Sequence, residues 1–126
     1  MNEAVLKHGA FGWNELLTTD VAAARQFYAA LFGWETERYP GGSFDYTLVK
    51  VDGEAVGGIM TLPPECAGMP PSWGVYVTVN DVEATARDAE RLGGKLLRPP
   101  EDIPEVGRFC VVQDPQGATL CAIQYR

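Results

Sequence analysis

The chain is poor in the residues that build disulfide scaffolds, zinc sites and nucleic-acid interfaces. Its 126 residues include three cysteines and one histidine. Cys66, Cys110 and Cys121 lack the paired spacing of a zinc ribbon or a disulfide framework. The ten Lys and Arg residues are outnumbered by seventeen Asp and Glu residues and form no basic cluster that would neutralise phosphates or anionic lipids. We therefore expect reduced thiols, and neither nucleic acid nor a membrane as a partner.

Long hydrophobic runs are also missing. A transmembrane helix needs about 18 or more apolar residues in succession, and the sequence has no such run. The first residues show no basic region that leads into an apolar run and a small-residue cleavage site. The hydrophobic content of 46% is nevertheless that of a folded domain. These features predict one cytoplasmic domain over residues 1–126.

The chain does contain an internal repeat. At an offset of 61 residues, identical residues recur at corresponding points of two segments. The matches are Asp20 with Asp81, Val21 with Val82, Ala23 with Ala84, Leu31 with Leu92, and Gly33 with Gly94. Two copies are too few for a solenoid, which needs roughly three or more. The repeat therefore predicts a duplication inside one domain.

Each copy is expected to begin with a strand, at residues 12–18 and 73–79, and to continue with a helix of about three turns. Asp20 and Asp81 are suitable helix caps. Apolar residues at helical spacing are expected to face a sheet: Ala24, Phe27, Tyr28 and Leu31 in the first helix, and Val82, Ala86, Ala89 and Leu92 in the second.

Three short strands are expected after each helix. They cover 35–39, 44–51 and 54–61 in the first copy, and 95–98, 107–113 and 118–125 in the second. A turn is expected at 40–42, and a loop rich in Pro and Glu over 99–106. The sequence thus predicts an α+β fold of two tandem βαβββ modules, at about 8–62 and 73–126, with a Pro-rich linker over about 63–72.

This arrangement resembles the vicinal oxygen chelate superfamily of glyoxalases, bleomycin-resistance proteins and dioxygenases, over essentially the whole chain. The segments that carry the resemblance are Glu15-Leu16-Leu17-Thr18-Thr19-Asp20, Ala24-Arg25-Gln26-Phe27-Tyr28, Leu31-Phe32-Gly33-Trp34 and the turn Asp114-Pro115-Gln116-Gly117. The resemblance implies that the modules form a partly closed, eight-stranded, barrel-like cleft with the helices outside. It also implies a homodimer, because members commonly pair modules across two chains.

The resemblance places metal ligands on the first and last strand of each module, but these positions hold poor ligands here. Counting seven residues back from each capping aspartate leads to Trp13 and Gly74. Counting four residues on from the glycine of the DPxG turn leads to Cys121, and the matching place in the first module is Gly57 or Gly58. Trp and Gly cannot ligate, and one thiolate would lack partners. We therefore expect neither a metal nor a cofactor.

Strand alternation predicts which side chains would line the implied cleft. Trp13, Glu15 and Leu17 share one face of the first strand, and Gly74, Tyr76 and Thr78 share one face of the fifth, with Val75, Val77 and Val79 under the helix. On the last strand the inward face would hold Thr119, Cys121 and Ile123. The expected ligand contacts are Trp13, Glu15, Tyr46, Trp73, Tyr76, Phe109 and Cys121, with Trp73 at the module junction or the cleft rim.

Glu15 has three interpretations. In a semi-apolar cleft it would be a general base with a raised pKa, a counter-ion for a cationic ligand, or half of a buried ion pair, with Arg108 as a possible partner. Only the first would imply an enzyme. Cys121 is expected to be an inert thiol, because no motif places a histidine beside it.

The sequence therefore favours a metal-independent protein, rather than an enzyme, that sequesters a small aromatic or cationic organic molecule, as the bleomycin-resistance branch does. One alternative is a glyoxalase-like or dioxygenase-related metalloenzyme with a displaced ligand set, drawn from His8, Glu15 or Glu54. Another is an accessory domain that acts mainly through a protein partner.

Overall fold

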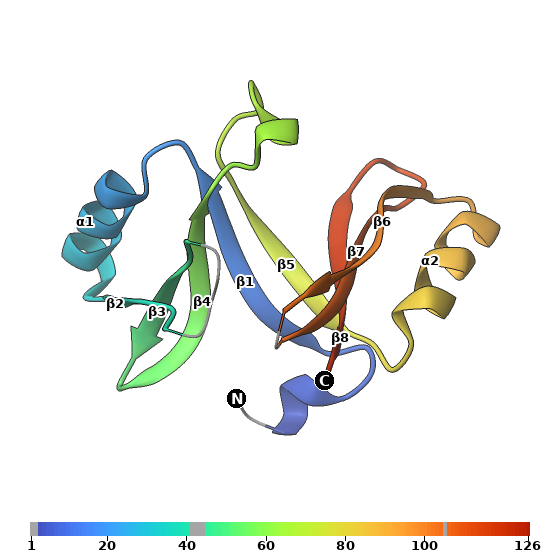
Figure 1. Ribbon diagram of the computed structural model, residues 1–126, viewed down its shortest axis with the longest axis horizontal. Helices are drawn as coiled ribbons and strands as arrows, with labels where there is room; N and C mark the ends of the chain where they lie inside the picture. The colour runs from blue at the N-terminus through green and yellow to red at the C-terminus, as the bar shows by residue number, and fades with distance from the viewer. Residues whose placement is uncertain (1–2, 41–44, 105) are drawn as a thin grey trace. The chain divides into compact units, whose positions relative to one another are not determined.

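A computed structural model describes residues 3–40, 45–104 and 106–126 of the chain. Its eight strands and two α-helices follow the order βαβββ-βαβββ (Figure 1). By contacts, residues 14–73 form one compact unit, and residues 74–126 form a second together with the described residues up to Trp13. The predicted α+β class and the tandem βαβββ modules are confirmed. The predicted turn at 40–42 falls largely outside the described residues, as does the first residue of the strand expected over 44–51.

The first unit contains a sheet in the order β2-β3-β4-β1. Its strands are β1 (Phe11–Thr18), β2 (Glu35–Arg38), β3 (Thr47–Val51) and β4 (Glu54–Thr61). β1 pairs in parallel with β4, and β3 pairs antiparallel with both β2 and β4. Asp52 and Gly53 join β3 to β4 with φ values of 51° and 79°. Two positive φ values are typical of the two-residue hairpin that an Asp-Gly sequence predicts.

Helix α1 (Val21–Phe32) packs on the core of this sheet. Leu16, Val49 and Ile59 are buried there, and the helix places Ala24 and Tyr28 against them. The prediction that Phe27 and Leu31 face the sheet is wrong, because their exposed fractions are 59% and 56%. Since apolar residues surround this helix on most sides, their spacing did not identify which side faces the core.

The second unit contains a sheet in the order β5-β8-β7-β6. Its strands are β5 (Ser72–Thr78), β6 (Lys95–Ile103), β7 (Gly107–Gln113) and β8 (Thr119–Tyr125). β5 pairs in parallel with β8, and β7 pairs antiparallel with β8 and β6. Two short 3-10 helices lie outside the modules, η1 (Glu3–Leu6) before β1 and η2 (Pro64–Cys66) in the Pro-rich segment.

Helix α2 (Val82–Arg91) packs on the core of the second unit. Val82 and Ala86 are buried against Cys110 and Ala122, as the helical spacing predicts. Leu92 is the exception, because it follows the helix and is 67% exposed. Among the described residues, neither helix is long and apolar enough to cross a membrane.

Strand β6 is longer than predicted. The sequence indicates a loop from Pro99 onward, whereas the strand continues through Pro99 and Pro100 to Ile103. β6 is the last strand in the order of this sheet and its pairing with β7 has two irregularities, on either side of Arg98. Prolines are tolerated in such a strand because the missing N–H groups remove no hydrogen bond from a fully paired ladder.

The two helices begin with the same cap. Asp20 has φ −144° and ψ 94°, and its carboxylate accepts a hydrogen bond from Ala23 N at 3.0 Å. Asp81 has φ −145° and ψ 98°, and accepts from Ala84 N at 3.1 Å. The predicted duplication is therefore visible in the backbone geometry of both helix starts. At the other end of α1, Gly33 has the left-handed conformation that glycine adopts easily, with φ 74°.

We predict that Asp20→Ala and Asp81→Ala each lower the free energy of unfolding by about 1 kcal/mol, because each removes the acceptor for an otherwise unpaired helix N–H. Urea denaturation measures the change. Asp20→Asn and Asp81→Asn are the matched controls, since asparagine keeps the acceptor and should retain most of the stability. Equal losses in the Ala and Asn variants would contradict a capping role.

We also predict that Cys110 lowers the free energy of unfolding at alkaline pH. Burial, with a smaller effect from Glu83, raises the pKa of the Cys110 thiol. In the unfolded chain the thiol loses its proton from about pH 8.5. Stability is therefore complete below that pH and falls as the pH rises towards the folded-state pKa, because only the unfolded chain ionises.

The measurement is the free energy of unfolding from pH 7 to pH 10, compared with Cys110→Ala. Above the pKa of the unfolded thiol, the free energy of unfolding should fall with pH more steeply in the wild type than in Cys110→Ala, by up to about 1.4 kcal/mol per pH unit. Parallel slopes in the two proteins would show that Cys110 does not contribute.

Candidate functional site

The parallel pairs of the two units fix which side chains share a face. Glu15 on β1 lies opposite Gly58 on β4, and Tyr76 on β5 lies opposite Cys121 on β8. Because β1 and β4 correspond to β5 and β8 in the duplication, Gly58 is the counterpart of Cys121. The choice between Gly57 and Gly58 that the sequence leaves open is therefore resolved in favour of Gly58.

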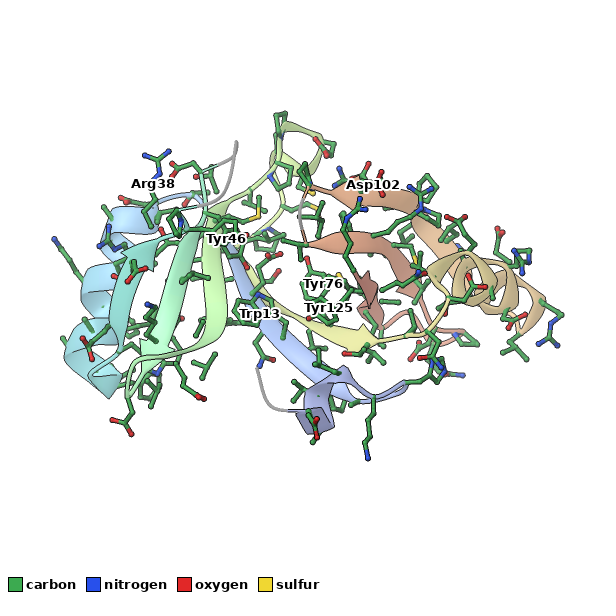
Figure 2. The ribbon with its side chains drawn as sticks, turned by 60° about the horizontal axis from the view of Figure 1, so that its bottom comes forward. Trp13, Arg38, Tyr46, Tyr76, Asp102 and Tyr125 are labelled. Atoms are coloured by element: carbon green, nitrogen blue, oxygen red, sulfur yellow. The ribbon has the colours of Figure 1, made fainter. Side chains whose placement is uncertain are left out.

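Glu15 and Tyr46 meet over Gly58 in the first unit. The Tyr46 hydroxyl donates a hydrogen bond to Glu15 Oε1 at 2.8 Å. Tyr46, labelled in Figure 2, directly precedes β3 in the chain, and only 9% of it is exposed. A Cβ atom added at Gly58 would overlap the hydroxyl and the ring of Tyr46. The glycine thus provides the space through which the phenol reaches the carboxylate.

This face of the first sheet is the one opposite α1. Leu16 packs into the core with the helix, so that Glu15, its neighbour in the strand, points to the other side. Strand alternation predicts this orientation for Glu15, and it is confirmed. The register of Tyr46 is not visible in the sequence, because the residue lies outside a regular strand.

In the second unit, Tyr76 and Phe109 lie together on the face opposite α2. Tyr76 is buried, and its ring centroid is 6.3 Å from that of Phe109. The Arg98 guanidinium lies 5.6 Å from the Phe109 ring centroid, within the range of a cation–π contact. Arg98 also pairs with Glu101. This face therefore combines two aromatic rings with a cation.

Cys121 shares the second face with Tyr76. Its neighbour Ala122 is buried in the core under α2, which directs the half-buried Cys121 to the opposite side. Val77 and Val79 pack under the helix, as predicted. Trp13 is half-buried and belongs by contacts to the second unit, whereas Glu15 belongs to the first.

Trp73 lies on the helix side of the first unit rather than with Glu15 and Tyr46. Its indole Nε1 donates to the Tyr28 hydroxyl at 3.1 Å. The Trp73 ring centroid is 5.5 Å from that of Tyr28 and 5.8 Å from that of Trp34. Strand alternation indicates this side for Trp73, because the next residue, Gly74, is expected on the cleft face and neighbours in a strand point to opposite faces. The aromatic cluster itself joins distant segments and has no local signal.

Arg108, considered from the sequence as a partner for Glu15, pairs instead within the second unit. Its Nε contacts Glu83 at 2.6 Å and its Nη1 contacts Asp102 at 3.2 Å. The hydrogen bonds to Glu83 and Asp102 raise the pKa of Arg108 above its ordinary value. Nearby, burial raises the pKa of the Tyr125 phenol. Arg108 is thus engaged in a surface ion-pair network of the second unit.

The residues at the four metal positions of the superfamily do not fit a metal ion. Trp13, Gly58 and Gly74 supply no ligand, and Cys121 supplies one thiol. Of the displaced set, Glu15 and Glu54 do not lie together within the first unit. His8 Nδ1 accepts a hydrogen bond from Asn80 N in the second unit, and Glu54 lies four residues, or about 13 Å, along β4 from the position opposite Glu15. In the part of the chain that the structure describes, no three His, Cys, Asp or Glu side chains come together as a metal site.

Comparisons with known proteins agree with this fold. The model of the Glyoxalase/Bleomycin resistance protein/Dioxygenase superfamily matches residues 10–122. A Mycobacterium tuberculosis protein that bears the name glyoxylase CFP32 is 39% identical over 117 residues, which are 90% of this chain and 45% of the relative. The anthracycline biosynthesis protein DauV of Streptomyces sp. is 34% identical over 125 residues, which are 89% of this chain and 46% of the relative. The chain thus spans about half the length of these curated relatives.

Solved structures show the same fold at lower sequence identity. Methylmalonyl-CoA epimerase from Mycobacterium tuberculosis aligns with a TM-score of 0.64 and 17% identity, covering 100% of this chain and 93% of that one. A superfamily member from Vibrio splendidus aligns with a TM-score of 0.58 and 16% identity, covering 88% of this chain and 95% of that one. The resemblance seen in the sequence is confirmed, and the chain belongs to the glyoxalase/bleomycin resistance protein/dioxygenase superfamily.

Proposed function

We propose that this chain is a metal-independent, small-molecule-binding member of its superfamily, and that Glu15 and Tyr46 contact the ligand. One observation carries the proposal. The Tyr46 phenol occupies the space that a ligating side chain at Gly58 would need, and it is hydrogen-bonded to Glu15 there. The space beside Gly58, where the superfamily has a metal ligand, is thus taken up by the Glu15–Tyr46 pair.

The chemistry of this pair favours an aromatic or cationic organic ligand. A carboxylate directed by a hydrogen bond attracts a positive charge, most strongly where water is excluded. Within the first unit, the Tyr46 ring lies beside this carboxylate and adds an aromatic edge to it. The relative DauV is named an anthracycline biosynthesis protein, which is in keeping with an aromatic small molecule. Trp13 and Cys121 remain candidate contacts in the second unit.

A proton-transfer enzyme is the second candidate function, and the same hydrogen bond favours it. A carboxylate and a phenol in contact can take a proton from a ligand and return one. The two candidates differ in whether the ligand is changed. Recovery of unaltered ligand after prolonged incubation supports sequestration, whereas ligand turnover that Glu15→Gln abolishes supports the enzyme.

The third prediction concerns ligand affinity. A thermal-shift screen of aromatic and cationic compounds should identify a ligand, and calorimetry should then show that Tyr46→Phe and Glu15→Gln each weaken binding roughly 10-fold or more, as expected for a lost hydrogen bond to a charged group. Glu54→Gln is the matched control, because it changes an exposed carboxylate of the same sheet and should leave the affinity unchanged.

Unchanged affinity in both Tyr46→Phe and Glu15→Gln would remove the pair from the binding site. Elemental analysis of protein purified without chelators tests metal independence separately. We expect no stoichiometric divalent metal, and no change in ligand affinity on adding Ni, Zn, Mn or Fe. A stoichiometric metal would favour the metalloenzyme alternative.

The fourth prediction concerns Gly58. Gly58→Ala should displace Tyr46 from Glu15 and cost about 1–3 kcal/mol of stability, because the new methyl group overlaps the ring. In a Tyr46→Ala background the same Gly58→Ala change should cost much less, since the space is then open. A double-mutant cycle by urea denaturation measures this coupling, and additive losses would show that Gly58 does not serve to accommodate Tyr46.

A further inference from the structure

The first unit has a groove at the point where helix α1 leads into strand β2. Its volume is about 530 Å³, which is in the range of small-molecule sites. The lining comes from the end of α1 and from the end of β3 with the turn after it, and includes Phe32, Gly33, Trp34, Val51 and Asp52. Trp34 packs with α1 on the helix side of the sheet, whereas Glu15 and Tyr46 lie on the other side. The groove is therefore separate from the Glu15–Tyr46 pair.

Two aromatic rings line the groove. The ring centroids of Phe32 and Trp34 are 5.2 Å apart, and the ring planes are tilted by 41°. Phe32 keeps 59% of its surface exposed. The face of an aromatic ring carries a partial negative charge, and it attracts a cation that lies within about 6 Å of the ring centre. The exposed ring thus offers a surface to a positively charged group.

The charged residues of the groove favour a cation as well. Glu35 and Asp52 line it, and within residues 3–40, 45–104 and 106–126 neither carboxylate has an ion-pair partner. Lys50 is the one basic residue of the lining and lies opposite Glu35 in the β2–β3 pair. Its ammonium pairs instead with Glu37 at 2.8 Å, outside the lining. Carboxylates therefore predominate at the groove.

The C-terminal end of α1 adds to this negative charge. The last turn of a helix leaves carbonyl groups without partners in the helix and carries a partial negative charge. Gly33, the cap of α1, lines the groove, and the last turn of α1 has no basic residue that would offset this charge. Helix α2 differs, because Arg91 lies in its last turn. In the first unit, a cation in the groove would take the place of such a residue.

We propose that this groove binds a small organic cation with an alkylated ammonium group, in contact with the Phe32 ring and the Asp52 carboxylate. The rings, the carboxylates and the helix end all favour a positive charge, and an alkylated ammonium combines that charge with an apolar surface. A bare metal ion needs several oxygen ligands, and the described residues contain no group of three metal-ligating side chains. This site goes beyond the proposed function, because it lies on the helix side of the sheet.

The fifth prediction is that choline binds in the groove more tightly than its uncharged analogue 3,3-dimethylbutan-1-ol. The two molecules have the same shape and differ in whether nitrogen or carbon carries the three methyl groups. Amide NMR shifts should saturate at Gly33, Trp34 and Asp52 with a Kd in roughly the millimolar range, as expected for a ligand of few atoms. The alcohol should bind roughly 10-fold more weakly, because it lacks the charge that the rings and carboxylates attract.

Two substitutions test the proposed contacts. Phe32→Leu removes the ring and keeps an apolar side chain. Asp52→Asn removes the charge, and asparagine tolerates the φ of 51° at this position. Each should weaken choline binding roughly 3-fold or more. Phe27→Leu and Glu54→Gln are the matched controls and should leave the Kd unchanged, because they alter an exposed ring of the same helix and an exposed carboxylate of the same hairpin outside the lining.

Circular dichroism should show that all four variants are folded, because the altered residues are exposed. Equal affinity for the alcohol would overturn the proposal, as would choline shifts that do not saturate below about 100 mM or an unchanged Kd in both Phe32→Leu and Asp52→Asn. Shifts confined to residues around Glu15 would also overturn it, since choline would then lie on the other face of the sheet. Glu15→Gln should leave the affinity of the groove unchanged, which separates this test from that of the proposed function.

Discussion

The parallel pairing of the first strand of each module with the last is the constraint on which the candidate site depends. In a strand, successive side chains point to opposite faces, so that one register decides the face of every residue. With Glu15 opposite Gly58, Leu16 and Ile59 lie under α1 and Glu15 lies on the other side. A slip of one residue would bury the Glu15 carboxylate in the apolar core, at a cost of several kcal/mol. The register of β1 against β4 is thus fixed by the apolar residues under α1 and by the Glu15 carboxylate on the other face.

Gly58 is more than a missing ligand in this arrangement. A side chain able to ligate a metal at this position would collide with Tyr46, so the phenol and the ligand exclude each other. A ligating side chain at Gly58 and the Glu15–Tyr46 hydrogen bond are therefore mutually exclusive. Its consequence is electrostatic, because the site presents a carboxylate and a phenol where a metal centre would present a Lewis acid. Under the proposed function, such a face selects ligands by hydrogen bonding and positive charge.

Much of the fold follows from local sequence signals, and most of what was missed depends on distant contacts. The caps at Asp20 and Asp81 and the alternation around Glu15 and Tyr76 act within a few residues. They were read correctly from the sequence. The pairing of Tyr46 with Glu15 spans 31 residues and that of Trp73 with Tyr28 spans 45, and no local pattern specifies either.

The errors at Leu31 and in β6 have a different origin. An apolar residue at helical spacing reads as core whether its own sheet or another surface covers it. Two consecutive prolines read as a loop, although the last strand of a sheet accepts them. In both cases the sequence identified the chemistry of the residue correctly. What it did not show was which neighbours surround that residue.

Helices α1 and α2 differ in the residues that they do not use for packing on their own sheets. Both helices begin with the same cap geometry, and each packs on the core of its own unit. Packing on a sheet requires one apolar stripe, and α2 meets that need while its remaining residues are charged. α1 carries Phe27, Leu31 and Phe32 in addition to the residues that its core uses. Packing of α1 on its own sheet therefore does not account for these three exposed residues. The exposed apolar residues of α1 lie on the helix side of the first sheet, whereas Glu15 and Tyr46 lie on its other side, with the buried core residues between them.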